Sequence, residues 1–162
     1  RVKLPAVVPA PESLADIYRA ITELGRRIGR EKAADSLIKE MRGRIKPAGR
    51  KPKAVYVELS PRPLITIGRN NFLSEMIGMA GGRNVFDDLT QPYPAVSQEA
   101  VIERNPAVII VLHPEGIVGR IGWSHIKAVN EKRVYADLDP DLLLRPGPRL
   151  VLGFRELEKF LE

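Results

Sequence analysis

The chain has 162 residues, of which 44% are hydrophobic, and this is enough for one domain with a substantial core. It contains no cysteine, which excludes disulfide bonds, thiolate metal sites and cysteine nucleophiles from this chain. No apolar run reaches the length that crosses a bilayer. Residues 2–8 resemble the end of a strand that has no partner before it, so we expect the natural protein to continue upstream of Arg1.

The net charge of +6 comes from one short stretch of the sequence. Without its six basic residues, the 26 Lys and Arg residues fall to 20, which equals the number of acidic residues. The stretch also holds Pro47, Gly49 and Pro52, and it has no aromatic side chain for base stacking. We therefore expect a solvated linker and no nucleic-acid partner, with a phosphate- or RNA-binding patch as the alternative. The six residues are Arg42, Arg44, Lys46, Arg50, Lys51 and Lys53.

Two helices are predicted ahead of this stretch. The first begins at Ser13 or Glu12, after the breaker Pro9-Ala10-Pro11, and the second covers residues 31–45. The apolar stripe of the second helix is narrow, which fits either a strut that joins two lobes or an ordinary surface helix. The stripe of the first helix contains Leu14, Ile17, Tyr18, Ile21, Leu24 and Ile28, and that of the second contains Ala34, Leu37, Ile38, Met41 and Ile45.

Strands and helices alternate from residue 54 to the end. Residues 107–112 form an unbroken apolar run rich in β-branched side chains, which indicates a central parallel strand buried on both faces. The pattern predicts an α/β fold, a three-layer α/β/α sandwich with a mostly parallel central sheet and right-handed crossovers. Strands are expected at 54–59, 64–67, 84–86, 107–112 and 133–138, helices at 71–80, 97–105, 124–129 and 150–161, and a loop at 139–149.

No catalytic motif is complete. Gly116, Gly119 and Gly122 follow a buried strand, but their spacing is neither GxGxxG nor GxxxxGK[ST], and no lysine follows to hold a phosphate. His113 and His125 lack the spacing of metal ligands, and we expect His113 to be a hydrogen-bonded residue at the end of its strand. The sequence thus predicts no catalytic residue, no metal site and no cofactor.

Candidate binding residues gather in the loops that follow the predicted strands. Ligands of open α/β sheets bind outside the carboxyl ends of the strands, and here the loops begin at Leu59, Asp87, His113 and Asp139. Aromatic faces and guanidinium groups in these loops suit a flat or anionic ligand, although Trp123 by itself is expected to be a core anchor. The candidates are Arg62, Tyr93, Trp123, Arg145 and Arg149.

Four runs, taken in order, resemble the class III substrate-binding proteins of ABC importers, which serve cobalamin, haem and ferric siderophores. The runs are residues 80–86, 93–99, 105–110, and Trp123 through 133–135 to 145–149. The resemblance implies two Rossmann-like α/β lobes that are joined by one long helix, with the ligand between them. It divides this chain into the end of an N-terminal lobe (1–30), an inter-lobe helix with the basic linker (31–53), and a C-terminal ligand-binding lobe (54–162).

Site residues follow from the resemblance. Tyr93 and Arg145 match residues that line the ligand cleft, and Glu99 matches a glutamate that pairs with arginines of the membrane permease. Leu59 and Ile65 fall where the cobalamin binder has aromatic residues, so their aliphatic character argues against cobalamin itself. Arg62 joins this ligand-binding set through its place in the loop after Leu59.

The implied function is that of a non-catalytic receptor. It would bind an iron chelate (a siderophore or haem) or a corrinoid and deliver it to ABC permease subunits. It would work on the periplasmic or extracellular face of the membrane, held there by the permease or by a lipid anchor outside this segment. The alternatives are a stand-alone nucleotide- or phosphate-binding α/β enzyme that uses the glycine-spaced loop, and an interaction module that binds RNA through the basic linker.

Overall fold

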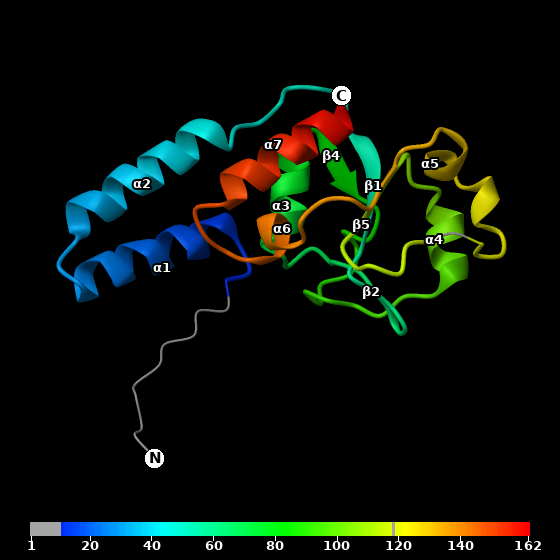
Figure 1. The fold of residues 1–162 in the computed structure, drawn as a ribbon, viewed down its shortest axis with the longest axis horizontal. Coiled ribbons are helices and arrows are strands. Elements are labelled where there is room, and N and C mark those ends of the chain that lie inside the picture. The colour runs from blue at the N-terminus through cyan, green and yellow to red at the C-terminus, as the bar shows by residue number, and fades with distance from the viewer. Residues whose placement is uncertain (1–10, 118) are drawn as a thin grey trace, which may run out of the picture.

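A parallel four-stranded sheet forms the centre of the molecule, with strand order β4-β1-β5-β6. The computed structural model describes residues 11–117 and 119–162 (Figure 1). The strands are β1 Lys53–Glu58, β4 Gly82–Asn84, β5 Val108–Val111 and β6 Val134–Tyr135, and a separate hairpin consists of β2 Ser60–Pro61 and β3 Leu64–Ile65.

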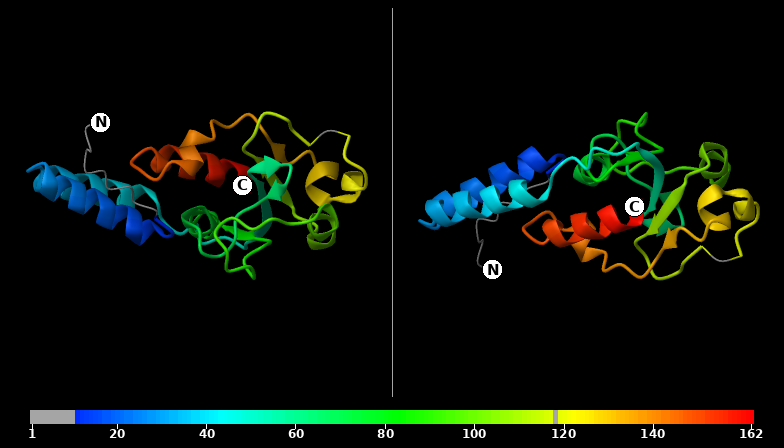
Figure 2. Two further views of the ribbon diagram at one scale, coloured as in Figure 1. Left: turned by 90° about the horizontal axis from the view of Figure 1, so that it is seen from below. Right: turned by 90° about the horizontal axis from the view of Figure 1, so that it is seen from above.

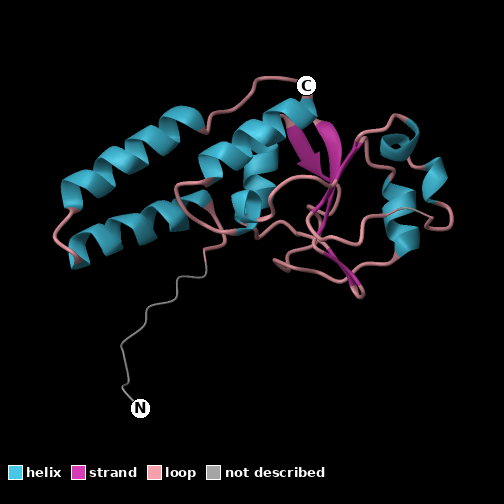
Figure 3. Ribbon diagram, viewed as in Figure 1, coloured by secondary structure: helices cyan, strands magenta, loops and turns pink. Residues whose placement is uncertain are grey.

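Helices cover both faces of this sheet (Figure 3). One face carries α3, α6 and α7, and the other carries α4, η1 and α5, while the α1-α2 hairpin extends away from the sandwich (Figures 1 and 2). The predicted three-layer α/β architecture is thereby confirmed. The helices are α1 Leu14–Arg27, α2 Glu31–Arg44, α3 Phe72–Met79, α4 Gln98–Arg104, the 3-10 helix η1 Trp123–His125, α5 Lys127–Asn130, α6 Asp141–Leu144 and α7 Leu150–Leu161.

The two central strands supply side chains to two separate cores. Val108 and Ile110 of β5 face the core beneath α3 and α7, whereas Ile109 and Val111 face the core beneath α4 and η1. All four side chains are fully buried. This confirms the prediction from the apolar run, because only a strand covered on both faces has no polar alternation.

Polar side chains cap the first turns of α1 and α4, where the sequence predicts helices to begin. Ser13 accepts a hydrogen bond from the Asp16 amide and completes a capping box at α1, and Ser97 accepts one from the Ala100 amide at 3.1 Å to begin α4. Asn105 ends α4 with a left-handed φ of 42°. Each cap satisfies backbone groups that have no partner within the helix.

The α1-α2 hairpin joins the sandwich only at its base. Leu14 and Ile17 pack into the core of α3 and α7, and the Leu14 amide donates to the Glu75 carboxylate of α3 at 2.8 Å. Farther along α1, Leu24 and Ile28 are 59% and 61% exposed. The last two residues of the predicted apolar stripe therefore face solvent in this structure.

The basic linker is partly solvated, and some of its residues also bind the end of α7. Arg50 and Lys53 donate to the carbonyl oxygens of Glu158 and Glu162, and Arg133 donates to that of Phe160 at 2.6 Å. These carbonyls belong to the last turn of α7, where cations are favoured and acceptors lack helical partners. Most other linker residues are exposed, as expected.

Several element boundaries differ from the predictions. β4 ends at Asn84 because the side chain of Asn84 accepts a hydrogen bond from the Phe86 amide and turns the chain there. β6 is shorter than the predicted 133–138. Part of the predicted loop 139–149 is the helix α6, which begins where the Asp139 carboxylate accepts from the Asp141 amide at 3.0 Å.

The predicted strand at 2–8 lies outside the described residues. Within the described ranges, every helix is too short or too polar to span a bilayer.

Two helical glycines offer a test of this packing. A Cβ on Gly153 would lie 2.2 Å from the backbone oxygen of Leu142, whereas a Cβ on Gly43 meets nothing within 4 Å. We expect Gly153→Ala to lower the free energy of unfolding by about 2 kcal/mol or more, because backbone has to move. Gly43→Ala should raise it by up to about 1 kcal/mol. Urea unfolding of both variants measures this, and a stabilised Gly153→Ala protein would contradict the α6-α7 packing.

Candidate functional site

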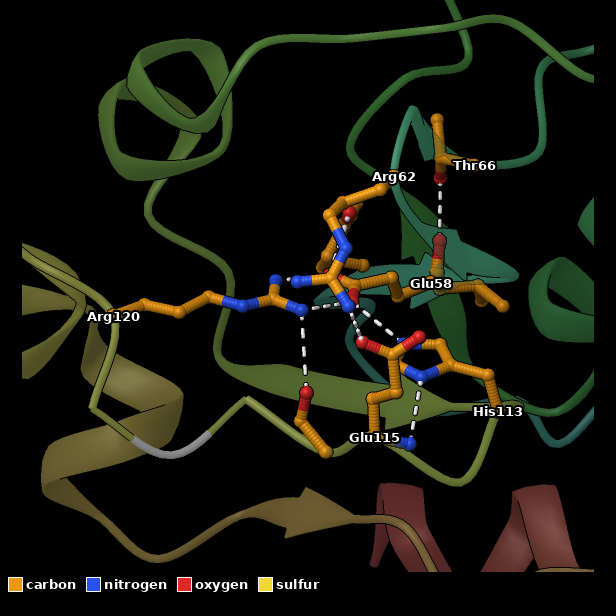
Figure 4. A network of polar contacts seen from close by, with 9 residues as sticks. Glu58, Arg62, Thr66, His113, Glu115 and Arg120 are labelled. Carbon is orange, nitrogen blue, oxygen red and sulfur yellow. Dashed lines mark hydrogen bonds and ion pairs between the residues drawn. The ribbon is translucent and has the colours of Figure 1, made fainter.

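A buried carboxylate lies at the carboxyl end of the central strand β1. Glu58, the last residue of β1, is 0% exposed. Its oxygens accept from the Tyr56 hydroxyl at 3.1 Å and from both terminal nitrogens of Arg120 at 2.6 and 2.7 Å, and His113 Nε2 lies 2.7 Å away (Figure 4). A buried charge is tolerated only when it is paired and hydrogen-bonded, and the two-pronged arginine contact is the strong form of such pairing.

This network, which we call the Glu58 network (Tyr56, Glu58, His113 and Arg120), fastens the loop after β5 to the sheet. Arg120 also donates to the Gly116 carbonyl at 3.2 Å, and its guanidinium lies 4.5 Å from the centre of the Trp123 ring. His113 thus is hydrogen-bonded at the end of its strand, and Trp123 is a buried core residue, as the sequence predicted for both.

The charge states of Tyr56 and Arg120 in the Glu58 network follow from burial and from hydrogen bonding. Burial raises the pKa of the Tyr56 hydroxyl, and the nearby charge of Glu58 raises it further. The hydrogen bonds to Glu58 raise the pKa of Arg120 above its usual value. Tyr56 therefore stays neutral, and Arg120 stays charged beside the Glu58 carboxylate.

The hairpin after β1 brings together three of the predicted ligand-binding residues. The Leu59 amide donates to the Ile65 carbonyl at 2.9 Å, and both side chains are half-buried. Arg62 lies at the hairpin turn, where its exposed side chain forms an ion pair with Glu115 of the loop after β5. This pair lies beside the Glu58 network (Figure 4).

Tyr93 comes from the loop that follows β4, and Arg145 directly follows α6. The Tyr93 side chain is 56% exposed and lines a surface depression of about 270 Å³ together with Leu144 and Pro146. Arg145 lies between these two residues in the sequence, and its exposed guanidinium is 2.6 Å from the Asp141 carboxylate. The structure therefore brings Tyr93 to the segment that contains Arg145.

Glu99 lies in the exposed first turn of α4. Hydrogen bonds from its own backbone amide and from the Ser97 hydroxyl lower its pKa, so this carboxylate is ionised at neutral pH. In a parallel βαβ unit the helix begins at the edge of the sheet where the first strand ends. Glu99 thus lies at the same carboxyl edge as the candidate ligand-binding residues.

Glu58 and Arg120 were missed by sequence reasoning. The available signals were an apolar strand that ends on a charged residue and an arginine between two glycines. Gly116, Gly119 and Gly122 have φ values of 63°, 78° and 80°, so they serve the turns that carry Arg120 back to Glu58. Within the described ranges no three His, Asp or Glu side chains are grouped as a metal site.

The Glu58 network makes a prediction about stability. Glu58→Gln leaves the largely buried Arg120 without its carboxylate, and we expect the free energy of unfolding to fall by about 3 kcal/mol. Glu115→Gln removes the partner of Arg62 from an exposed ion pair and should cost less than about 1 kcal/mol. Urea unfolding compares the two, and equal small losses would show that the Glu58 network does not hold the loop.

Comparison with known proteins identifies the family of this chain. Residues 2–142 match the family described as periplasmic binding protein. An uncharacterized ABC transporter substrate-binding lipoprotein, YvrC of Bacillus subtilis, is 35% identical over 158 residues, which cover 90% of this chain and 50% of that protein. The vitamin B12-binding protein of Vibrio cholerae is 31% identical over 149 residues, which cover 90% of this chain and 52% of that protein.

A solved structure shows the same fold. It is described as a possible iron-binding, periplasmic solute-binding protein of Staphylococcus epidermidis, and it superposes with a TM-score of 0.82 at 29% identity over 92% of this chain and 62% of that one. The chain spans about half the length of the curated relatives named above. With its family match over residues 2–142, the chain belongs to the periplasmic binding protein family, a family of binding proteins and not of enzymes, as its sequence led us to expect.

Proposed function

We propose that this chain forms the C-terminal lobe and the inter-lobe helix of a two-lobed solute receptor of an ABC importer. In this proposal residues 1–30 belong to the end of the first lobe, residues 31–53 join the lobes, and residues 54–162 close over the solute. The supporting observation is that Tyr93 and several arginines occupy one edge of the sheet, around the fixed Glu58 network.

The arginines at this edge are available to an anionic solute. Arg62, Arg145 and Arg149 are held by the exposed carboxylates of Glu115, Asp141 and Asp139, respectively. Exposed ion pairs contribute at most about 1 kcal/mol, so exchanging a protein carboxylate for an oxyanion of the solute costs little. Each guanidinium can then bind a planar oxyanion with two hydrogen bonds.

The neighbouring side chains suit a large, partly apolar solute. Tyr93 offers an exposed aromatic face, and Leu59 and Ile65 offer aliphatic surface. Two of the similar proteins are named for vitamin B12 binding and for possible iron binding. An iron chelate such as haem or a ferric siderophore fits these features well, and a corrinoid is the second member of the proposed class.

Delivery requires contact with a membrane permease. The exposed, ionised Glu99 provides a docking charge at the solute-binding edge, which suits arginines on the permease. We place the receptor on the periplasmic or extracellular face of the membrane, held by the permease or by a lipid anchor outside this segment. Membership in a family of binding proteins disfavours the stand-alone nucleotide- or phosphate-binding enzyme.

Tyr93 tests the solute-binding part of the proposal. In the full-length receptor we expect Tyr93→Ala to raise the dissociation constant of the preferred solute about tenfold, equivalent to about 1.4 kcal/mol. Tyr93→Phe keeps the aromatic ring and should retain most of the affinity. Fluorescence quenching with haemin, ferrichrome and cyanocobalamin measures this. A wild-type receptor that binds none of the three probes would overturn the proposed solute class.

Glu99 tests the docking part. Glu99→Arg should reduce uptake into proteoliposomes that contain the permease at least about tenfold, because like charges then meet at the interface. Solute affinity should not change. Glu103→Arg is the matched control, since Glu103 is an exposed residue one turn along the same helix and should transport normally. Parallel losses of transport and solute affinity in Glu99→Arg would remove the docking role.

A further inference from the structure

The loop between β4 and α4 carries Tyr93 between two prolines. Pro92 and Pro94 have no backbone amide, and a residue that precedes a proline is restricted to extended conformations, so the backbone at Tyr93 has little freedom. The Tyr93 side chain is nevertheless 56% exposed and lines the surface depression of about 270 Å³. An exposed aromatic ring on a loop binds a solute best when the loop is ordered beforehand.

The segment that joins β3 to α3 holds this loop through the proline carbonyls. The Thr66 amide donates to the Pro94 carbonyl at 3.1 Å. The Gly68 amide donates to the Pro92 carbonyl at 3.2 Å. The segment is itself attached to the sheet, because the Thr66 hydroxyl donates to the Val57 carbonyl of β1 at 2.6 Å. The loop around Tyr93 is therefore tied to the central strand through this segment.

Glycine at position 68 allows the two segments to approach this closely. A Cβ on Gly68 would lie 2.0 Å from the backbone oxygen of Gln91 and 2.6 Å from that of Leu89. Both atoms belong to the backbone, so the loop would have to move to admit a side chain. The loop and the segment thus pack directly against each other.

Asn71 joins the start of α3 to the same loop. Its side-chain oxygen accepts from the Leu73 amide at 3.0 Å and caps α3, and its side-chain nitrogen donates to the Pro92 carbonyl at 3.2 Å. The residue is 4% exposed. A cap needs only the oxygen, and Ser13 and Ser97 cap α1 and α4 with a hydroxyl. The hydrogen bond from the Asn71 nitrogen is therefore additional to the cap.

We propose that Asn71 is a positioning residue for solute binding. Its side-chain nitrogen fixes the Pro92 carbonyl, and with it the peptide that leads into Tyr93, before the solute arrives. This inference rests on the proposed function, in which Tyr93 contacts the solute. A loop that is ordered in advance loses less conformational entropy on binding, so Asn71 raises the affinity by acting through Tyr93.

The test is a double-mutant cycle in the full-length receptor. Asn71→Ser keeps an acceptor for the α3 cap and removes the donor to Pro92. We expect it to raise the dissociation constant about threefold, measured with whichever of haemin, ferrichrome and cyanocobalamin binds most tightly. In a receptor that already carries Tyr93→Ala, Asn71→Ser should have no further effect, because the two changes remove the same contact.

A control variant separates positioning from stability. Ile109→Val shortens a fully buried side chain of β5, so it should lower the melting temperature of the receptor. Its affinity for the same probe should equal that of the wild type. If Ile109→Val weakens binding as much as Asn71→Ser does, the effect of Asn71 is one of general stability and the positioning role is wrong.

Hydrogen-deuterium exchange without solute gives a second measurement. Asn71→Ser should accelerate exchange in residues 87–96 and leave α3 unchanged, because the cap of α3 is kept. Faster exchange in α3 alone would show that Asn71 serves only as a cap, and the positioning role would be wrong.

The binding results also separate this inference from the proposed function. If Tyr93→Ala weakens binding and Asn71→Ser does not, the positioning role is wrong and the receptor function stands. If Asn71→Ser weakens binding equally with and without Tyr93, Asn71 is a solute contact of its own and does not act through Tyr93. If the wild-type receptor binds none of the three probes, the proposed solute class and this inference are both wrong.

Discussion

The carboxylate of Glu58 is the constraint on which the carboxyl edge of the sheet depends. It lies at the end of a strand that is buried on both faces, where an unpaired charge would cost several kcal/mol. Arg120 and His113 meet that cost by binding it, and both belong to the segment after β5. That segment is therefore held across the end of β1, and the position of Glu115 follows from it.

The basic residues at the two edges of the parallel sheet have different kinds of partner. At its carboxyl edge, arginines are exposed and paired with exposed carboxylates, so their charges are open to exchange. At its amino edge, Arg50, Lys53 and Arg133 are occupied by the carbonyl oxygens at the end of α7. The basic run that dominates the net charge thus partly stabilises a helix end. The carboxyl edge thus carries arginines whose charges a solute can reach.

Much of the fold could be predicted because its signals are local. The run at 107–112 indicated a strand covered on both faces, and Ser97 and Asn105 marked the ends of α4. The grouping of Arg62, Tyr93 and Arg145 at one edge followed from the rule that parallel strands end together. The division into lobes and the roles of these residues remain predictions, because they depend on a solute and a partner.

The Glu58 network could not be predicted because its pairing is distant in the sequence. Glu58 and Arg120 are 62 positions apart, and no periodicity connects a strand end with an arginine in a glycine-spaced loop. Asn84 ended β4 early through a hydrogen bond of its own side chain, which a propensity pattern does not register. The same applies to α6, where Asp139 begins a turn within a predicted loop. The local pattern located the elements, whereas hydrogen bonds of single side chains set some of their boundaries.

The central claim is that the carboxyl edge of the sheet receives the solute. Hydrogen-deuterium exchange of the full-length receptor, with and without whichever of haemin, ferrichrome or cyanocobalamin it binds, tests this directly. The account predicts solute-dependent protection in residues 59–65 and 85–96 and around Arg145, with no change in the amino-edge linker at 46–52. Protection confined to that linker or to α7, with the carboxyl-edge loops unchanged, would contradict it.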